Sequence, residues 1–252
     1  MEKRINVEKT INQMTSWLQE QVKNANAKGL LVGISGGLDS AVVANLIKRA
    51  FPNDSLGVIM PVKNNLVDVH DAEMVVQTAN LNALTIDLSD AHHTLHETIT
   101  NALKHKDYWN ESSDKMSDAN LRARLRMSTL YTIASQMNYL VVGTENAPEW
   151  YTGYFTKYGD GGVDLQPIIQ WTKQEVREAA QFLEVPESVI QKKPSADLWF
   201  GQTDEEELGT SYDYIDAYLN GESIPKKDQK VIEQLHERTT HKRQIATQFH
   251  FK

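Results

Sequence analysis

The chain of 252 residues contains no cysteine. Disulfides, zinc–thiolate sites, iron–sulfur clusters and cysteine nucleophiles are therefore excluded. Basic residues are the minority, because 26 Lys and Arg stand against 34 Asp and Glu and give a formal net charge of -8. This balance argues against non-specific binding along duplex nucleic acid, which requires an excess of positive charge. It still permits a local basic pocket for a phosphate-bearing ligand.

Long apolar runs are missing too. The longest ones, such as residues 30–34, fall far short of the roughly 20 residues that a membrane-spanning helix needs. Residues 1–11 are charged and lack the apolar segment of a signal peptide. We therefore expect a cytoplasmic protein with no membrane partner. With 40% hydrophobic and 24% charged residues, the chain has a globular composition, and we expect a single domain over residues 1–252.

Short apolar runs alternate with helical patterns over the first half of the chain. This alternation is typical of a parallel sheet with helices on both faces. Residues 90–115 interrupt it, because they are polar and rich in histidine and show no clean period after Leu103. Strands are predicted at 30–34, 55–60, 83–88 and 139–143, and helices at 5–27, 41–50, 67–79 and 119–137.

The second half of the chain has a different character. Residues 151–164 are rich in glycine and aromatic residues and predict a loop. Thr172 and Glu175 form a capping box, which predicts the start of a helix. Residues 191–210, with the acidic run 204–207, predict a mobile, solvated surface loop rather than a metal site. A helical C-terminal extension is expected beyond it, with helices at 211–219 and 226–238.

The strongest chemical signal is the turn Ser35-Gly36-Gly37-Leu38-Asp39-Ser40, which follows a predicted strand and precedes a predicted helix. Glycines allow backbone N–H groups to point inward at a phosphate, and the N-terminus of a helix favours negative charge. Asp39 would repel a bare phosphate, whereas a carboxylate that holds Mg²⁺ beside the phosphates suits this position. The spacing differs from that of both G-x-x-x-x-G-K-[ST] and G-x-G-x-x-G loops.

This S-G-G-x-D-S turn resembles the pyrophosphate loop of the N-type ATP pyrophosphatases. Further strings are similar to those of ammonia-dependent NAD synthetases, and they occur in that family's order over about residues 30–243, with 52–118 as the poorest match. These strings are NLRARLRM (120–127), GT (143–144), TGYFTKYGDGGVD (152–164), KPSADL (193–198), DEEELGTSYD (204–213) and HKR (241–243).

The resemblance implies an α/β fold with a Rossmann-like parallel sheet flanked by helices, of the adenine nucleotide alpha hydrolase type. It implies the ATP-dependent amidation of deamido-NAD by ammonia, through an acyl-adenylate, with release of AMP and pyrophosphate. Ser195 stands where the family usually has Thr, and the hydroxyl is retained. ATP is expected to bind to Gly33, Ile34, Ser35, Gly36, Gly37, Leu38, Asp39, Ser40, Thr144, Lys173 and Ser195.

The same resemblance assigns the remaining roles. Asp39 and Glu149 are expected to hold Mg²⁺. The expected catalytic residues are Asp39, Lys173 and Asp160, with Asp160 orienting or deprotonating ammonium. Deamido-NAD is expected to contact Arg124, Lys157, Asp164, His241 and Lys242.

The source of nitrogen and the oligomeric state follow by the same comparison. Relatives that take nitrogen from glutamine carry an extra amidase domain with a cysteine nucleophile. This chain has no cysteine, so we expect no amidase domain and the use of free ammonia. Relatives are homodimers, which makes residues 5–27 and 119–137 candidate interface elements.

Several residues have competing interpretations. Arg122, Arg124 and Arg126 cannot all face one way, because helical residues two apart lie on different sides. His92 and His96 have the spacing of a metal pair, but the sequence supplies no evident third ligand, so a metal site is disfavoured.

Two other functions also fit the pyrophosphate loop. One is another amidating ATP pyrophosphatase, such as the synthetase half of GMP synthetase, which would leave the T-K-Y-G-D-G-G string unexplained. The other is a nucleotide sensor without catalysis, which would need neither two metal-binding carboxylates nor a second ligand site.

Overall fold

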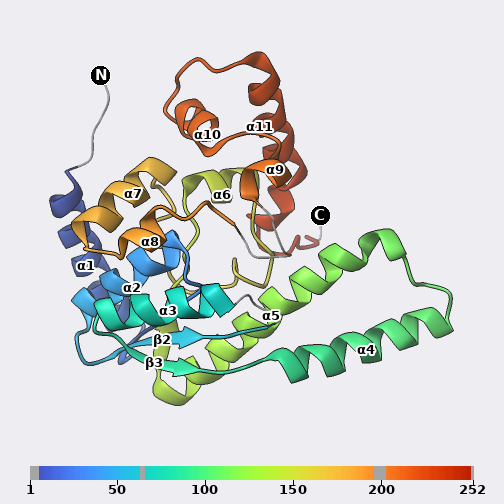
Figure 1. The fold of residues 1–252 in the computed structure, drawn as a ribbon, viewed down its shortest axis with the longest axis horizontal. Helices are drawn as coiled ribbons and strands as arrows, with labels where there is room; N and C mark the ends of the chain where they lie inside the picture. The colour runs from blue at the N-terminus through green and yellow to red at the C-terminus, as the bar shows by residue number, and fades with distance from the viewer. Residues whose placement is uncertain (1–5, 63–65, 196–202, 251–252) are drawn as a thin grey trace.

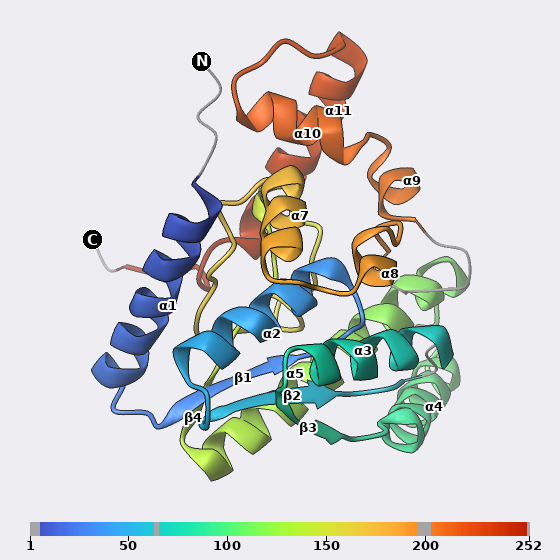
Figure 2. The same ribbon diagram turned by 60° about the vertical axis from the view of Figure 1, so that its left-hand side comes forward.

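The computed structural model describes residues 6–62, 66–195 and 203–250. Within these residues, four parallel strands form one sheet in the order β3-β2-β1-β4 (Figure 2). This arrangement confirms the predicted parallel sheet. The strands are β1 (Gly29–Gly33), β2 (Ser55–Ile59), β3 (Asn82–Thr85) and β4 (Tyr139–Val141).

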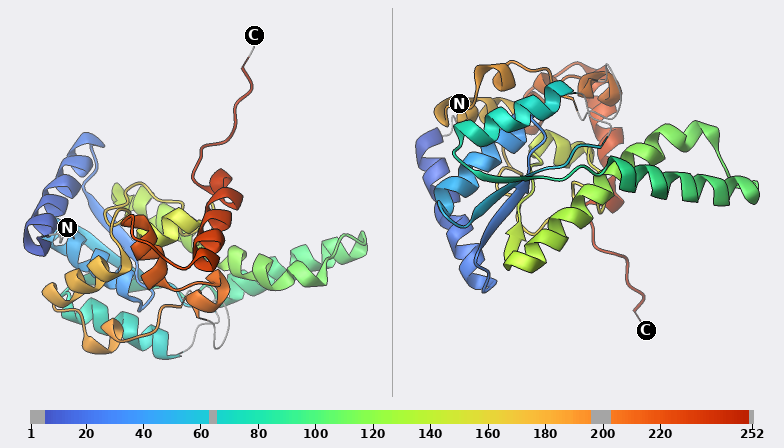
Figure 3. Two further views of the ribbon diagram at one scale, coloured as in Figure 1. Left: turned by 90° about the horizontal axis from the view of Figure 1, so that it is seen from above. Right: turned by 60° about the horizontal axis from the view of Figure 1, so that its bottom comes forward.

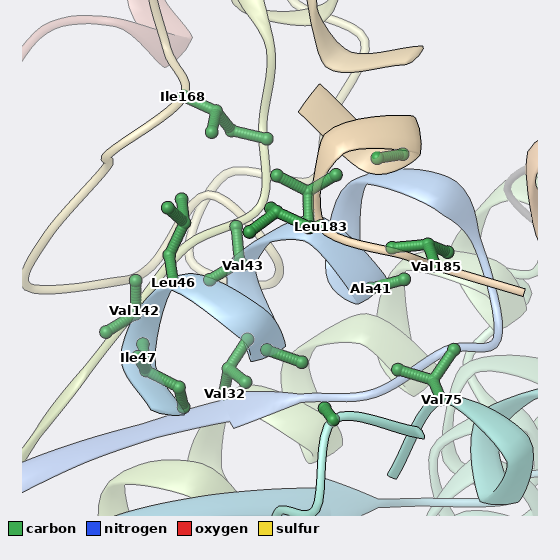
Figure 4. Close-up of a cluster of buried hydrophobic side chains, with 14 of the residues drawn as sticks. Val32, Ala41, Val43, Leu46, Ile47, Val75, Val142, Ile168, Leu183 and Val185 are labelled. Carbon is green, nitrogen blue, oxygen red and sulfur yellow. The ribbon is translucent and has the colours of Figure 1, made fainter. Parts of the chain in front are cut away.

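Alternating side chains of β1 enter two different cores. Leu30 and Val32 pack on one face of the sheet, where Figure 4 shows Val32 in the same cluster as Val43 and Ile47. Burying each such side chain stabilises the fold by about 1.5–3 kcal/mol. The helices that contribute to this core are α1 (Val7–Asn24), α2 (Leu38–Ala50), α3 (Leu66–Thr78), α7 (Lys173–Phe182) and α8 (Glu187–Ile190).

The opposite face of the sheet is covered by one long helix, α5 (Glu111–Met137). Leu31 and Val58 point to this face and pack with Leu130 and Ala134 of α5. Helices therefore lie on both faces of the sheet, as the alternation of strands and helices in the sequence predicts.

Residues 90–115 are where the sequence-based expectation was least complete. They contain a regular helix, α4 (Ser89–His105), and α5 begins at Glu111 instead of residue 119. The two helices form an arm that projects from the body of the protein (Figures 1 and 3). His92 is the buried residue of α4. The apolar residues Leu95, Ile99 and Leu103 of α4 keep a helical spacing, but most positions between them are polar, so the pattern was not recognised as a helix in the sequence.

The C-terminal part forms a small cluster of its own around Tyr212, Ile215 and Ile232. Residues 151–164 are not wholly a loop, because α6 extends to Thr152, and the predicted loop 191–210 contains a further helix, α9. Residues 196–202 of that loop lie outside the described part. The elements here are α6 (Ala147–Thr152), α9 (Asp204–Leu208), α10 (Tyr212–Leu219), α11 (Lys226–Arg238) and a 3₁₀ turn (Thr240–Lys242).

The strand order creates a crevice at one edge of the sheet. The chain leaves β1 for β2 and β3 on one side and then returns to β4 on the other side of β1. The segments that follow β1 and β4 therefore diverge, and ligands of open α/β sheets bind at such a switch point, outside the carboxyl ends of the strands. No helix of the described residues is both long enough and apolar enough to cross a membrane.

Candidate active site

A cavity of about 300 Å³ opens at the carboxyl ends of β1 and β4. Its walls include the turn after β1, the segment after β4 and one side of α5. Two further walls come from the start of α7 and the segment 192–195. Further lining residues come from the end of β2, from α3 and from the loop 154–163, so the site is assembled from many separate parts of the chain at the switch point of the sheet.

The turn after β1 has the expected strand–turn–helix context. Gly36 has a φ of +81°, a left-handed conformation that favours glycine. The Ser40 hydroxyl donates to the Gly37 carbonyl over 3.0 Å, and the Gly37 N–H donates to the Ser35 hydroxyl oxygen over 3.2 Å. These bonds hold the turn at the N-terminus of α2, where backbone N–H groups and the helix dipole favour an anion.

A buried lysine joins two carboxylates in the cavity. The Lys173 ammonium donates to Asp39 Oδ2 over 2.6 Å and to Glu149 Oε1 over 3.2 Å. Burial alone would lower the pKa of Lys173, but the two carboxylates outweigh it and raise this pKa above its ordinary value. Burial raises the pKa of Glu149 to about 7, although the Lys173 charge opposes that rise. Lys173 is 2% exposed, so it is not the surface lysine that its place beside a capping box would suggest.

The C-terminal extension supports this cluster. The Tyr212 hydroxyl donates to Asp204 Oδ2 over 3.0 Å and also lies 3.2 Å from Glu149 Oε1. The Tyr154 hydroxyl donates to Glu207 Oε2 over 2.8 Å. The expectation of a solvated acidic run is therefore wrong for Asp204, which is buried. Two tyrosines from other segments cover it, and sequence neighbours alone do not reveal that.

Asp216 of α10 fixes the start of α7. Its two carboxylate oxygens accept the backbone N–H groups of Lys173 and Gln174, each over 3.1 Å. The capping box of Thr172 and Glu175 is present as predicted. Lys173 is thus placed by a doubly capped helix end.

Asp216 also gives a prediction for stability against pH. Burial raises its pKa from 3.8 to about 6, so the folded protein holds this proton more tightly than the unfolded chain does. The resulting stabilisation is complete below about pH 4 and is lost as the pH rises through about 6, with a size of about 3 kcal/mol. In Asp216→Asn this loss should disappear. Urea unfolding between pH 4 and 7 gives the free energy of unfolding of both proteins. If this free energy changes with pH in the same way in both, the assignment to Asp216 is wrong.

Two more carboxyl groups line the cavity. Glu145 lies four residues after the end of β4 and is 4% exposed. Burial, followed by the charge of Asp160, raises the pKa of Glu145 well above its usual value. Asp160 belongs to the loop after α6 and is exposed, and its Oδ1 accepts the Thr156 N–H over 2.8 Å.

Several cations also line the cavity. Arg122 and Arg126 lie one turn apart on α5 and both line the cavity. An Arg122 Nη nitrogen donates to Asp118 Oδ2 over 2.9 Å, and Arg126 Nε donates to the Met60 carbonyl over 3.2 Å. Arg177, Lys192 and Lys193 also line the cavity. A cavity with this many cations suits a ligand that carries several phosphates.

The comparisons with known proteins decide the family. The model of the NAD synthase family matches residues 10–246. This chain belongs to the NAD synthase family. The NH(3)-dependent NAD(+) synthetase of Alkaliphilus oremlandii is 56% identical to it, over 94% of this chain and 95% of that protein. The predicted resemblance is therefore confirmed.

Solved structures agree with the NAD synthase family. The NMN synthetase from Francisella tularensis superposes with a TM-score of 0.90 at 35% identity, covering 98% of this chain and 100% of that one. The NH3-dependent NAD synthetase from Campylobacter jejuni gives a TM-score of 0.78 at 27% identity, with the same coverage.

The structure gathers most of the residues that the NAD synthase resemblance assigns to ATP. Gly36 is not among the residues that line the cavity and lies against α3 instead. The predicted ATP residues that line the cavity are Gly33, Ile34, Ser35, Gly37, Leu38, Asp39, Ser40, Thr144, Lys173 and Ser195.

The five residues assigned to deamido-NAD lie outside this cavity. An Arg124 Nη nitrogen donates to the Lys157 carbonyl over 3.3 Å, and the Lys157 ammonium contacts the His241 carbonyl. Lys242 donates to the carbonyls of Gly153 and Phe155, and Asp164 accepts the Tyr131 hydroxyl over 2.9 Å. These bonds link Arg124, Lys157 and the backbone of His241, whereas Asp164 bonds to Tyr131 and to the Val141 N–H.

Some residues of the site were missed at the sequence level. The i, i+4 spacing of Arg122 and Arg126 was a usable signal for a shared helix face. Glu145 and Tyr212 had no motif signal of their own. His92 and His96 were considered as a metal pair; both Nε2 atoms approach Asp118 Oδ1, at 3.2 and 3.7 Å. No group of three or more metal-binding side chains occurs in the described ranges.

Proposed function

We infer that this chain catalyses the ATP-dependent amidation of deamido-NAD to NAD with ammonia, through an acyl-adenylate. The observation that carries this function is the single cavity that joins the turn 35–40 to Asp39, Glu149 and Lys173. A carboxylate does not accept ammonia directly because its oxygen is a poor leaving group. Adenylation replaces that oxygen by AMP. Membership of the NAD synthase family disfavours GMP synthesis and a purely sensory role.

The residues of the cavity supply the electrostatics of adenylation. The turn 35–40 offers backbone N–H groups to the pyrophosphate that leaves. Lys173, Arg122 and Arg126 add positive charge where the phosphates must lie. Their fixed positions remove part of the cost of aligning ATP with the nicotinate carboxylate.

The carboxylates fit the expected Mg²⁺. Oxygens of Asp39 and Glu149 converge on one cation, the Lys173 ammonium. Proteins bind Mg²⁺ through one or two carboxylates plus the phosphates of a substrate rather than through a cage of side chains. Asp39 and Glu149 would therefore hold Mg²⁺ together with ATP. When bound, the ion would neutralise charge on the phosphates.

The position of deamido-NAD follows from the size of the cavity. A volume of about 300 Å³ lies at the low end for one drug-sized ligand, so ATP and a dinucleotide cannot both be enclosed. We propose that deamido-NAD extends from the cavity to the residues Arg124, Lys157, Asp164, His241 and Lys242. Asp160, at the loop between the two regions, would orient ammonium.

An assay of product formation tests the function. Purified protein is incubated with ATP, Mg²⁺, ammonium and deamido-NAD, and NAD, AMP and pyrophosphate are measured. We expect all three products in equal amounts. Glutamine in place of ammonium should give no NAD, because the chain has no thiol to release ammonia from it. Absence of pyrophosphate with ammonium and deamido-NAD would refute the proposal.

Nicotinate mononucleotide is a second candidate substrate, and the same assay tests it. The superposition with the NMN synthetase from Francisella tularensis is closer than that with the Campylobacter jejuni NAD synthetase. Amidation of nicotinate mononucleotide would use the same adenylation chemistry. The ratio of kcat/KM for the mononucleotide and for deamido-NAD decides between them, and a ratio above one would make the mononucleotide the substrate.

Asp39→Ala is expected to reduce turnover below detection while the fold is kept. Asp39 has a partly exposed side chain, and its carboxylate serves ligand binding rather than the core. Circular dichroism should match that of the parent, and Mg²⁺-dependent ATP binding should be lost in calorimetry. Activity near that of the parent would remove Asp39 from the metal site.

We also propose that the protein is a homodimer. The projecting arm exposes Leu95, Ile99 and Met116, which are between 39% and 45% accessible. A second copy of the chain would cover this apolar surface. Light scattering should give twice the chain mass of 28.6 kDa. The double substitution Leu95→Glu with Ile99→Glu should give the monomer, and a dimer that survives it would exclude the arm as the interface.

A further inference from the structure

The three carboxyl groups whose charges act on Glu145 each have a hydrogen-bond donor of their own. Asp39 and Glu149 share the Lys173 ammonium. Burial raises the pKa of Asp160, but the N–H bond from Thr156 and the charges of Lys242 and Arg126 oppose that rise. Glu145 differs from all three. Its Oε2 is buried and has no hydrogen-bond partner within the described residues.

Glu145 lies in the segment after β4 and lines the cavity. A Cβ at Gly143 would lie 2.9 Å from Glu145 Oε2 and 2.8 Å from a methyl of Val163. The glycine therefore leaves room for the carboxyl to fold back over the end of the strand, where it lines the cavity. A buried acceptor without a donor is unfavourable, and a ligand with N–H groups would satisfy it.

The surroundings of Glu145 favour a cation. The charged groups that act on it are Asp160 from the loop after α6, Glu149 from α6 and Asp39 from α2. All three are carboxylates, so their potential attracts positive charge. Lys173 of α7 is committed to Asp39 and Glu149. A small ion with several N–H donors matches both the space and the charge.

We propose that Glu145 is a catalytic residue that binds ammonium in the cavity and takes one of its protons. This assignment rests on the proposed amidation and adds a second carboxyl to Asp160. Burial and the neighbouring carboxylates make Glu145 a stronger base than a solvated glutamate. It is therefore better matched to the proton of ammonium than an exposed carboxylate is.

The reaction balances with groups already named. One N–H bond of ammonium breaks, and its proton bonds to the Glu145 carboxylate, which becomes a neutral acid. The lone pair of ammonia forms the C–N bond at the acyl carbon. The C–O bond to the phosphate breaks with its electron pair, and AMP leaves. The nitrogen, now positively charged, passes a second proton to the AMP phosphate or to water, which gives the neutral amide.

Glu145→Gln tests this role because it keeps the shape and removes the base. We expect kcat/KM for ammonium to fall about 100-fold at neutral pH, within the usual range for loss of a general base. Exchange of labelled pyrophosphate into ATP, with deamido-NAD present and ammonium absent, should stay within about twofold of the parent, because adenylation precedes the ammonia step. Glu145→Asp should recover part of the loss, and Glu222→Gln, at an exposed turn residue, is the matched control.

The pH dependence separates catalysis from structure. Only free ammonia reacts without the base, so the defect of Glu145→Gln should shrink as the pH rises. A constant defect at all pH values, or an equal defect in pyrophosphate exchange, would overturn the proposal and make Glu145 structural or metal-binding. A kcat/KM for ammonium within about twofold of the parent would also overturn it. Failure of the parent itself to exchange pyrophosphate would instead refute the proposed function.

Discussion

Lys173→Met should lower kcat/KM by a factor on the order of 10³ and destabilise the protein by about 3 kcal/mol in the absence of Mg²⁺. Lys173 is 2% exposed and is the cation between Asp39 and Glu149. Methionine fills the volume of the lysine stem but leaves two carboxylates facing each other without a positive charge. Breaking a buried ion pair in this way is far more costly than losing a surface lysine.

Mg²⁺ provides a second measurement on the same variant. If Asp39 and Glu149 hold the ion, Mg²⁺ should raise the melting temperature of Lys173→Met more than that of the parent, because it replaces the missing charge. Lys226→Met, at an exposed position of α11, controls for the loss of a lysine. An unchanged melting temperature without Mg²⁺ would show that the lysine does not balance the carboxylates.

The fold could be predicted where the buried surface is continuous. Leu30, Leu31 and Val32 are all fully buried, and their uninterrupted apolar run identified β1. The capping box of Thr172 and Glu175 correctly gave the start of α7. Helix α4 was missed because its packing partner is another surface helix, so few of its positions needed apolar residues.

The site could be predicted where its residues are consecutive. The turn 35–40 lies together in space because it is continuous in the chain, and its type follows from glycine and helix-terminus chemistry. Glu145 and Tyr212 became visible only when β4 and the C-terminal extension were placed against α2 and α7. Long-range contacts such as Tyr212 to Glu149 have no local signature in the sequence.

Gly36→Ala is the second substitution with a large expected effect. Gly36 has a φ of +81°, and an added Cβ would lie 2.5 Å from the Asp68 carbonyl oxygen of α3. An L-residue with this φ costs on the order of 1–3 kcal/mol, and the contact adds to that because it involves backbone that cannot turn aside. Gly36→Ala should therefore either destabilise the fold by about 3 kcal/mol or force the turn to move away from α3.

Both outcomes impair the site, and two other glycines identify the cause. Gly221→Ala has a similar φ of +78° with nothing within 4 Å of the new Cβ, so it should lose only about 1 kcal/mol through strain. Gly37 has a φ of -92°, and a Cβ added there meets only the Ser35 hydroxyl at 3.2 Å, so Gly37→Ala should be nearly as stable as the parent.

Urea unfolding ranks the stabilities of the three variants, and calorimetry with ATP shows whether the turn has moved. Equal stability of Gly36→Ala and Gly221→Ala, with ATP binding unchanged, would mean that the contact with α3 does not fix the turn. Because α3 leaves no room for a side chain at Gly36, ATP affinity should fall in Gly36→Ala alone of the two positive-φ variants.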